Sequence, residues 1–168
     1  LYDRGLTKRN KAEAERLVAE VIRRLSDPAL RKSSIGVVTF SNVQKEYIER
    51  KLAEAILSKR LEAEAYEREE PLFVKNLENV QGDERDVIFL SMVDSNEGDD
   101  GPLRLTSDGR EDAYKKRYNV AASRAKEQLW VVHSLDQDND LKADDIRKKL
   151  LDYARNPQDY KQKLEEIK

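Results

Sequence analysis

The chain has 168 residues, of which 39% are charged, and a formal net charge of −2. Its length suits one domain with a single core, and the balanced charge neither supports nor excludes binding to nucleic acid. Cysteine is absent, which excludes disulfides, a thiolate nucleophile and Cys-ligated zinc, and the single histidine, His133, excludes a His-rich metal site. We expect the chain to supply no metal site of its own.

The first third of the chain predicts two helices around one strand. Apolar residues at helical spacing predict a helix over residues 10–25, with Asn10 and Glu13 as a capping box. The β-branched run at residues 35–40 predicts a strand. A second helix follows over about residues 42–61, and these side chains are expected to face inward: Val43, Tyr47, Leu52, Ala55 and Ile56.

The rest of the chain alternates strands and helices. Short apolar runs at residues 72–75 and 87–93 predict two strands, and the second is apolar on both faces, which is typical of a central parallel strand covered by helices. Phe89 and Trp130 lie within apolar runs, so we expect both in the core. A loop, a helix, a strand and two further helical segments are predicted at residues 94–110, about 111–127, 129–133, near 143–154 and 157–167. This alternation predicts an α/β domain built on a parallel sheet.

The sequence lacks the parts of a self-sufficient nucleotide-hydrolysing site. The phosphate-binding loop GxxxxGK[ST] does not occur. The acidic pair Asp83-Glu84 precedes its strand, whereas a pair that holds Mg²⁺ usually follows one. His133 has no nucleophile in an elbow context to pair with, and we expect it to be structural. The chain alone is therefore not expected to be a complete enzyme.

Three segments of the chain carry its most specific pattern. IGVVTF at residues 35–40 with Gln44 resembles motif IV of the superfamily 1 helicases, QGDERDVI at residues 81–88 resembles motif V, and NVAASRAK at residues 119–126 resembles motif VI. Matching pieces cover roughly residues 5–135. They are most similar to the 5′→3′ translocating branch, which includes the RNA surveillance helicases.

The resemblance implies a RecA-like, three-layer α/β/α fold with a mostly parallel sheet over residues 1–136, followed by a helical extension over residues 137–168. It also implies that ATP with Mg²⁺ binds between this domain and an N-terminal RecA-like domain of the same polypeptide, which holds the phosphate loop and most of the metal contacts. That first domain is not in the chain, and Leu1 is not an initiator methionine. We therefore expect a fragment of a longer protein, inactive in isolation.

The resemblance also assigns roles to six residues. Motif VI supplies an arginine finger that stabilises charge on the transferring phosphoryl group, and motif V approaches the γ-phosphate and ribose. Glycine suits such a contact because main chain without a Cβ can approach phosphate closely. The assigned residues are Arg124 as the catalytic finger, Gly82, Glu84 and Gln81 at the nucleotide, and Asn76 and Thr39 at the nucleic-acid strand.

The leading hypothesis is the second motor domain of an ATP-dependent helicase or translocase that acts on single-stranded DNA or RNA. An alternative is a degenerate RecA-like docking module for nucleic acid or protein without ATP turnover. The missing basic residue of motif IV favours it, as does Asn76, where motif V normally begins with Thr. A third possibility is a parent protein that couples this motor to a nuclease. No apolar run approaches the ~20 residues that span a bilayer and no signal peptide opens the chain, so we expect a cytoplasmic protein.

Overall fold

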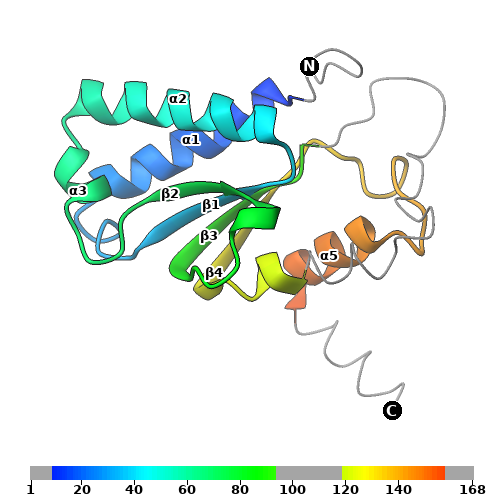
Figure 1. Cartoon of the computed structure of the whole chain (residues 1–168). Helices are drawn as coiled ribbons and strands as arrows, with labels where there is room; N and C mark the ends of the chain where they lie inside the picture. Colours follow the sequence, from blue (N-terminus) through cyan, green and yellow to red (C-terminus); the bar gives the residue numbers. More distant parts are fainter. Residues whose placement is uncertain (1–8, 94–118, 158–168) are drawn as a thin grey trace.

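A parallel sheet forms the centre of the molecule. The computed structural model describes residues 9–93 and 119–157. Its strands are β1 (Ile35–Thr39), β2 (Phe73–Asn76), β3 (Arg85–Ser91) and β4 (Ala125–Val132), which lie in the order β2-β1-β3-β4 with every neighbouring pair parallel (Figure 1). The predicted α/β domain with a parallel sheet is confirmed.

Helices cover both faces of this sheet (Figure 1). Helices α1 (Lys11–Ser26) and α2 (Asn42–Lys59) pack on one face, and the short α3 (Glu62–Tyr66) follows α2. The opposite face carries α5 (Ile146–Arg155) and the helical residues 119–122. These three layers are the RecA-like arrangement that the sequence predicts. None of the described helices is long and apolar enough to cross a membrane.

Both faces of β3 are buried, because its side chains alternate between two apolar clusters. Val87 and Phe89 join the cluster beneath α1 and α2, whereas Ile88 and Leu90 join the cluster on the α5 side. A strand covered on both sides in this way is the central parallel strand that the apolar run at residues 87–93 predicts.

The connection from β2 to β3 carries the motif V residues across the sheet. The 3₁₀-helix η1 (Leu77–Asn79) begins at the carboxyl end of β2, and only residues 80–84 separate it from the amino end of β3. Leu77 and Val80 are buried in the α5-side cluster, so the connection packs over that face of the sheet. It thus delivers residues 81–84 to the edge where β3 begins.

Helix α1 begins where the sequence predicts, but the second half of its capping box differs. Asn10 Oδ1 accepts a hydrogen bond from Glu13 N at 3.1 Å, as an N-cap does. The Glu13 carboxylate is directed at the end of β3, where its Oε1 accepts from Ser91 Oγ and from Val93 N. The acceptor for Asn10 N is Gln44 Oε1 at 3.0 Å. Side-chain hydrogen bonds therefore connect the beginning of α1 to α2 and to the end of β3.

Two residues predicted to lie in the core are exposed. The predictions for Val43 and Trp130 were wrong, since each is 41% exposed, and Ile48 takes the inward position on α2. Trp130 lies on β4, an edge strand of the described sheet, and α1 packs over β3 instead. Its indole lies against the Phe89 ring, at 5.8 Å between centroids, and against the Arg24 guanidinium at 4.9 Å.

Strand β4 begins at Ala125, earlier than the predicted residue 129, and the preceding helix ends at residue 122 instead of 127. The Ala-rich segment favours a helix, but Arg85 N donates to Arg124 O at 3.1 Å and draws the chain into the sheet. The other predicted elements among the described residues lie within three residues of their predicted bounds, whereas α3 and η1 were not predicted. The predictions made for residues 94–118 and 158–168 lie outside the described residues.

Candidate functional site

The residues assigned by resemblance lie at two opposite edges of the sheet. Gly82 and Glu84 precede β3, and Arg124 precedes β4. Because β3 and β4 are parallel neighbours, these residues meet at the amino edge of the sheet. Thr39 and Asn76 end β1 and β2, and they are register partners at the carboxyl edge.

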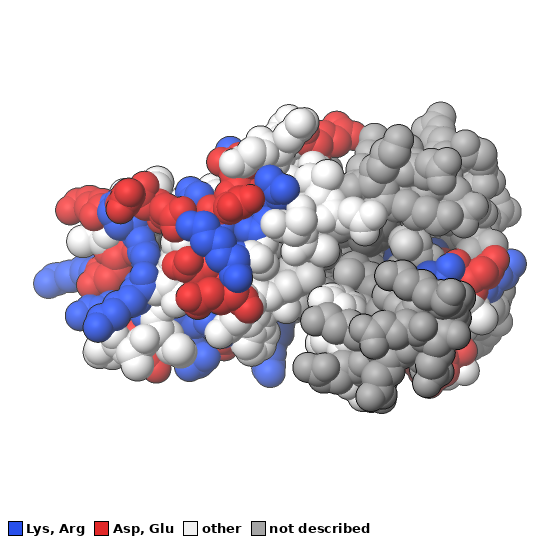
Figure 2. All heavy atoms as spheres, turned by 90° about the horizontal axis from the view of Figure 1, so that it is seen from below, with Lys and Arg blue, Asp and Glu red and all other residues white. Residues whose placement is uncertain are grey.

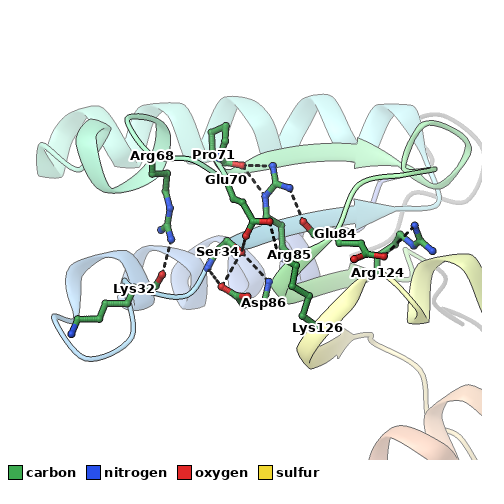
Figure 3. A network of polar contacts seen from close by, with 10 residues as sticks. All are labelled: Lys32, Ser34, Arg68, Glu70, Pro71, Glu84, Arg85, Asp86, Arg124 and Lys126. Carbon is green, nitrogen blue, oxygen red and sulfur yellow. Dashed lines mark hydrogen bonds and ion pairs between the residues drawn. The ribbon is translucent and has the colours of Figure 1, made fainter.

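Arg124 lies in the turn between the helical residues 119–122 and β4, where its own segment holds the side chain. Its Nε donates to Val120 O at 3.2 Å, and Nη2 donates to Ser123 Oγ at 3.0 Å. Nη1 lies 3.9 Å from Glu84 Oε1, which is a long ion pair, and the side chain is 20% exposed (Figure 3). The guanidinium is thus fixed in orientation with Nη1 toward the motif V loop. A planar, charged fork held this way suits a phosphate group.

The motif V loop presents main chain to its surroundings. Gly82 has φ +89°, a left-handed conformation that favours glycine, and a Cβ built there would meet nothing within 4 Å. Gln81 and Gly82 are both exposed. The loop is anchored to β2 because Lys75 Nζ donates to Asp83 Oδ2 at 2.7 Å. Open main chain on a fixed support can approach an anionic group closely.

The two residues at the carboxyl edge are occupied by local hydrogen bonds. Thr39 is fully buried, and its Oγ1 donates to Ser41 O at 2.8 Å and accepts from Ser41 N at 3.0 Å. Asn76 is 8% exposed; its Nδ2 donates to Asn42 Oδ1 at 2.6 Å and its Oδ1 accepts from Asn79 N at 3.2 Å. The structure brings Thr39 and Asn76 together, but both side chains are engaged in shaping the turns at this edge.

Gln44 organises the carboxyl edge, a role that its match to motif IV did not reveal. Its side chain is fully buried, and Nε2 donates to Asn10 O at 3.0 Å and to Ser91 Oγ at 3.3 Å. Asn10 also reaches past the end of β4, where its Nδ2 donates to Ser134 Oγ at 2.7 Å. These partners are distant in sequence, so no local pattern could have revealed the hydrogen bonds. The match to motif IV marked Gln44 as a residue of interest but gave no information about this structural role.

Charges of both signs intermingle on the face drawn in Figure 2. At the amino edge, the Lys126 ammonium and then the Ser34 hydroxyl lower the pKa of Glu70, and Glu70 in turn raises the pKa of Lys126. Burial lowers the pKa of His133. In the part of the chain that the structure describes, no group of three His, Asp or Glu side chains could hold a metal ion. The electrostatics of this edge therefore depend on local pairs.

Residues 3–136, most of the chain, match a family model described as an AAA domain. The chain belongs to this AAA domain family. Together with the ordered motifs IV, V and VI, the match confirms the resemblance to a superfamily 1 helicase domain. The assignment to the 5′→3′ branch stays a prediction.

Two relatives of this AAA domain are named as ATP-dependent helicases. It is 36% identical over 150 residues to the uncharacterized ATP-dependent helicase MG140 homolog of Mycoplasma pneumoniae, which covers 85% of this chain and 13% of the relative. It is 35% identical over 155 residues to the uncharacterized ATP-dependent helicase MG140 of Mycoplasma genitalium, which covers 88% of this chain and 13% of that relative. The chain thus spans about 13% of the length of these relatives.

Proposed function

We propose that this AAA domain is the second motor domain of an ATP-dependent nucleic-acid helicase or translocase. In this role it completes a nucleotide site whose ATP and Mg²⁺ are held mainly by the N-terminal RecA-like domain of the same polypeptide. The observation that carries the proposal is the position of Arg124 at the amino edge of β3 and β4, where its Nη1 lies 3.9 Å from Glu84 Oε1 in the loop that contains Gly82. The names of the two relatives support it.

The residues at the amino edge fit a shared phosphate site. Arg124 combines a permanent charge with a fixed orientation, and Gly82 leaves space in front of its main chain. Asp83 and Glu84 each lie beside a cation, Lys75 and Arg124 respectively, so they do not form a free acidic pair for Mg²⁺. When bound, ATP supplies the γ-phosphoryl group that is transferred to water. Most of the metal contacts are accordingly assigned to the first domain.

Each residue of the proposed site has a distinct task. Arg124 stabilises the negative charge that develops on the phosphoryl oxygens, and its local hydrogen bonds hold the guanidinium ready for this. Gly82 brings main chain close to the phosphates, while Glu84 and Gln81 line the nucleotide beside it. Before a phosphate arrives, the Glu84 carboxylate at 3.9 Å is a weak counter-ion for Arg124, and phosphate can displace it.

The nucleic acid is assigned to the carboxyl edge, which Thr39 and Asn76 shape. Since both side chains are engaged locally, their contribution to binding a single strand of DNA or RNA is to fix the turns after β1 and β2. Nucleotide and nucleic acid would then lie at opposite ends of one rigid sheet. Closure of the two motor domains on ATP would move this sheet, and with it the bound strand.

The decisive test is Arg124→Ala in the full-length parent protein. Loss of an arginine finger lowers ATP turnover by about 10³-fold or more, and Arg124→Lys recovers little because an ammonium lacks the planar fork. Turnover is measured by phosphate release at saturating ATP and nucleic acid. Arg16→Ala, which removes an exposed arginine of α1, is the matched control and leaves turnover unchanged. Turnover of Arg124→Ala within about threefold of wild type would overturn the assignment.

Two observations favour a second candidate, a docking module without ATP turnover. The polar side-chain atoms of Thr39 and Asn76 are engaged in local hydrogen bonds, and motif IV lacks its basic residue. The sequence of the parent protein separates the two candidates. A phosphate-binding loop GxxxxGK[ST] and an acidic pair at the end of a strand, both upstream of this domain, support the motor. If both are missing, the docking module is the better description.

A further inference from the structure

Four polar residues from four segments meet at the amino edge of the sheet, next to Arg124 (Figure 3). We refer to Ser34, Glu70, Asp86 and Lys126 as the edge clamp. Ser34 precedes β1, Glu70 lies in the loop before β2, Asp86 is in β3 and Lys126 is in β4. None of these residues was assigned a role by the motif comparison.

Ser34 is the centre of the edge clamp. Its main-chain N donates to Asp86 Oδ2 at 2.7 Å, and its Oγ accepts from Asp86 N at 2.9 Å. The same hydroxyl lies 2.6 Å from Glu70 Oε2, and Lys126 Nζ donates to Glu70 Oε1 at 2.6 Å. Ser34 is fully buried, so this part of the clamp is shielded from water. The contacts form one continuous path from β1 through β3 and the loop to β4.

The loop that carries Glu70 is itself held at both ends. The Arg68 guanidinium donates to the main-chain carbonyls of Arg31 at 2.9 Å and Lys32 at 2.7 Å. On the other side, Arg85 Nη2 donates to Pro71 O at 2.8 Å. Glu70 therefore approaches Lys126 from a fixed support, which makes the ion pair a constraint on β4.

The β3–β4 pairing is irregular at the point where the clamp reaches β4. Arg85 lies opposite Ala125 and Val87 lies opposite Gln128, so β4 has one extra residue in this interval, which contains Lys126. Such bulges weaken the ladder locally and re-aim the neighbouring side chains. At its beginning, β4 is therefore held less firmly by main-chain hydrogen bonds to β3 than a regularly paired strand would be.

We propose that the edge clamp positions Arg124 for phosphoryl transfer. Arg124 is joined to β3 by one main-chain hydrogen bond, from Arg85 N at 3.1 Å. Asp86 comes one residue after Arg85 and Lys126 comes two residues after Arg124, so the clamp holds the chain on both sides of that bond. The inference rests on the proposed role of Arg124. It assigns Glu70 and Lys126 as positioning residues that act through the arginine.

The clamp is tested in the full-length parent protein with Glu70→Gln and Lys126→Met. Each variant lowers kcat for ATP by about 10- to 100-fold, because a displaced catalytic group acts poorly, and leaves KM within about twofold. Their effects are not additive, since either change breaks the same pair, and Lys126→Arg retains kcat within about threefold of wild type. The melting temperature of each variant stays near the wild-type value because an exposed ion pair contributes little to stability.

Lys51→Met is the matched control, since it removes the Lys51–Glu54 pair on α2, which has similar exposure and a 3.0 Å separation. This control leaves kcat unchanged. A wild-type kcat for Glu70→Gln, together with a low kcat for Lys126→Met, would show that Lys126 contacts the nucleotide directly and would overturn the clamp. A rise in KM at constant kcat would overturn it as well. Arg124→Ala, measured in parallel, separates the two ideas: if it retains turnover, the proposed function fails, whatever the clamp does.

Discussion

Gly82 is the residue whose backbone conformation matters most to the proposed site. Its φ of +89° lies in the left-handed region, and the space around a Cβ is open. Gly82→Ala should therefore destabilise the chain through conformation alone, by about 1–2 kcal/mol. The free energy of unfolding, measured by urea denaturation at constant m, checks this value.

The variant Gly82→Asn tests whether backbone conformation or steric crowding determines the cost of replacing Gly82. Asn tolerates the left-handed region better than alanine does, so Gly82→Asn should cost less than Gly82→Ala although its side chain is larger. If Gly82→Asn were the more destabilising of the two, crowding would be the cause and the open space around Gly82 would be in doubt.

The resemblance to motifs V and VI assigned Gly82, Glu84 and Arg124 to one nucleotide, an assignment that stays a prediction. The structure places Glu84 and Arg124 at the same edge of the sheet, because residues that precede neighbouring parallel strands share one edge. The sequence could not predict the exposure of Trp130. An apolar strand residue is buried only if a helix covers it, and α1 packs over β3 instead of β4. The edge clamp could not be predicted from the sequence either, since Glu70 and Lys126 are 56 residues apart and no sequence motif links them.

At the scale of elements, periodicity predicted the described strands and helices well, and it failed where two tendencies compete. The segment at residues 119–126 is rich in helix formers, yet its last two residues join β4, because pairing with β3 satisfies their main-chain groups. Local propensity carries no information about a partner strand that lies forty residues away in the chain. The residue at which β4 begins, and therefore the position of Arg124 relative to the sheet, could be determined only from the structure.

The packing of α1, α2 and β3 depends on one buried amide, that of Gln44. Gln44→Leu keeps the size of the side chain but leaves Asn10 N without its acceptor, whereas Asn10 O still accepts from Ala14 N. A buried polar group without a partner costs about 1–3 kcal/mol, so this variant should lose at least about 1 kcal/mol of unfolding free energy. Lys45→Leu, one residue further along α2, is the control and should change the unfolding free energy by less than about 0.5 kcal/mol. Equal urea midpoints for the two variants would contradict the role of Gln44.

At the scale of the whole molecule, the residues proposed to contact the nucleotide and those proposed to contact nucleic acid lie at opposite edges of one sheet. This separation follows from chain order, since motif IV ends a strand, whereas motifs V and VI lead into strands. The order of the motifs was readable in the sequence, so the two edges were predictable. The long-range polar links that hold each edge together were not, because they join residues from 34 to 124 positions apart.

One consequence concerns ATP binding by the 168-residue chain alone. Within residues 9–93 and 119–157, the groups proposed to contact the nucleotide are an arginine fork and a main-chain loop on an open edge, where ionic contacts are screened by water and salt. Isothermal titration of the isolated chain with MgATP should therefore show no saturable binding at micromolar concentration, and Arg124→Ala should not change this result. The full-length parent, in which a second domain closes the site, should bind ATP under the same conditions. A micromolar dissociation constant for the isolated chain would mean that it contains a complete nucleotide pocket, and the division of the site between two domains would then be wrong.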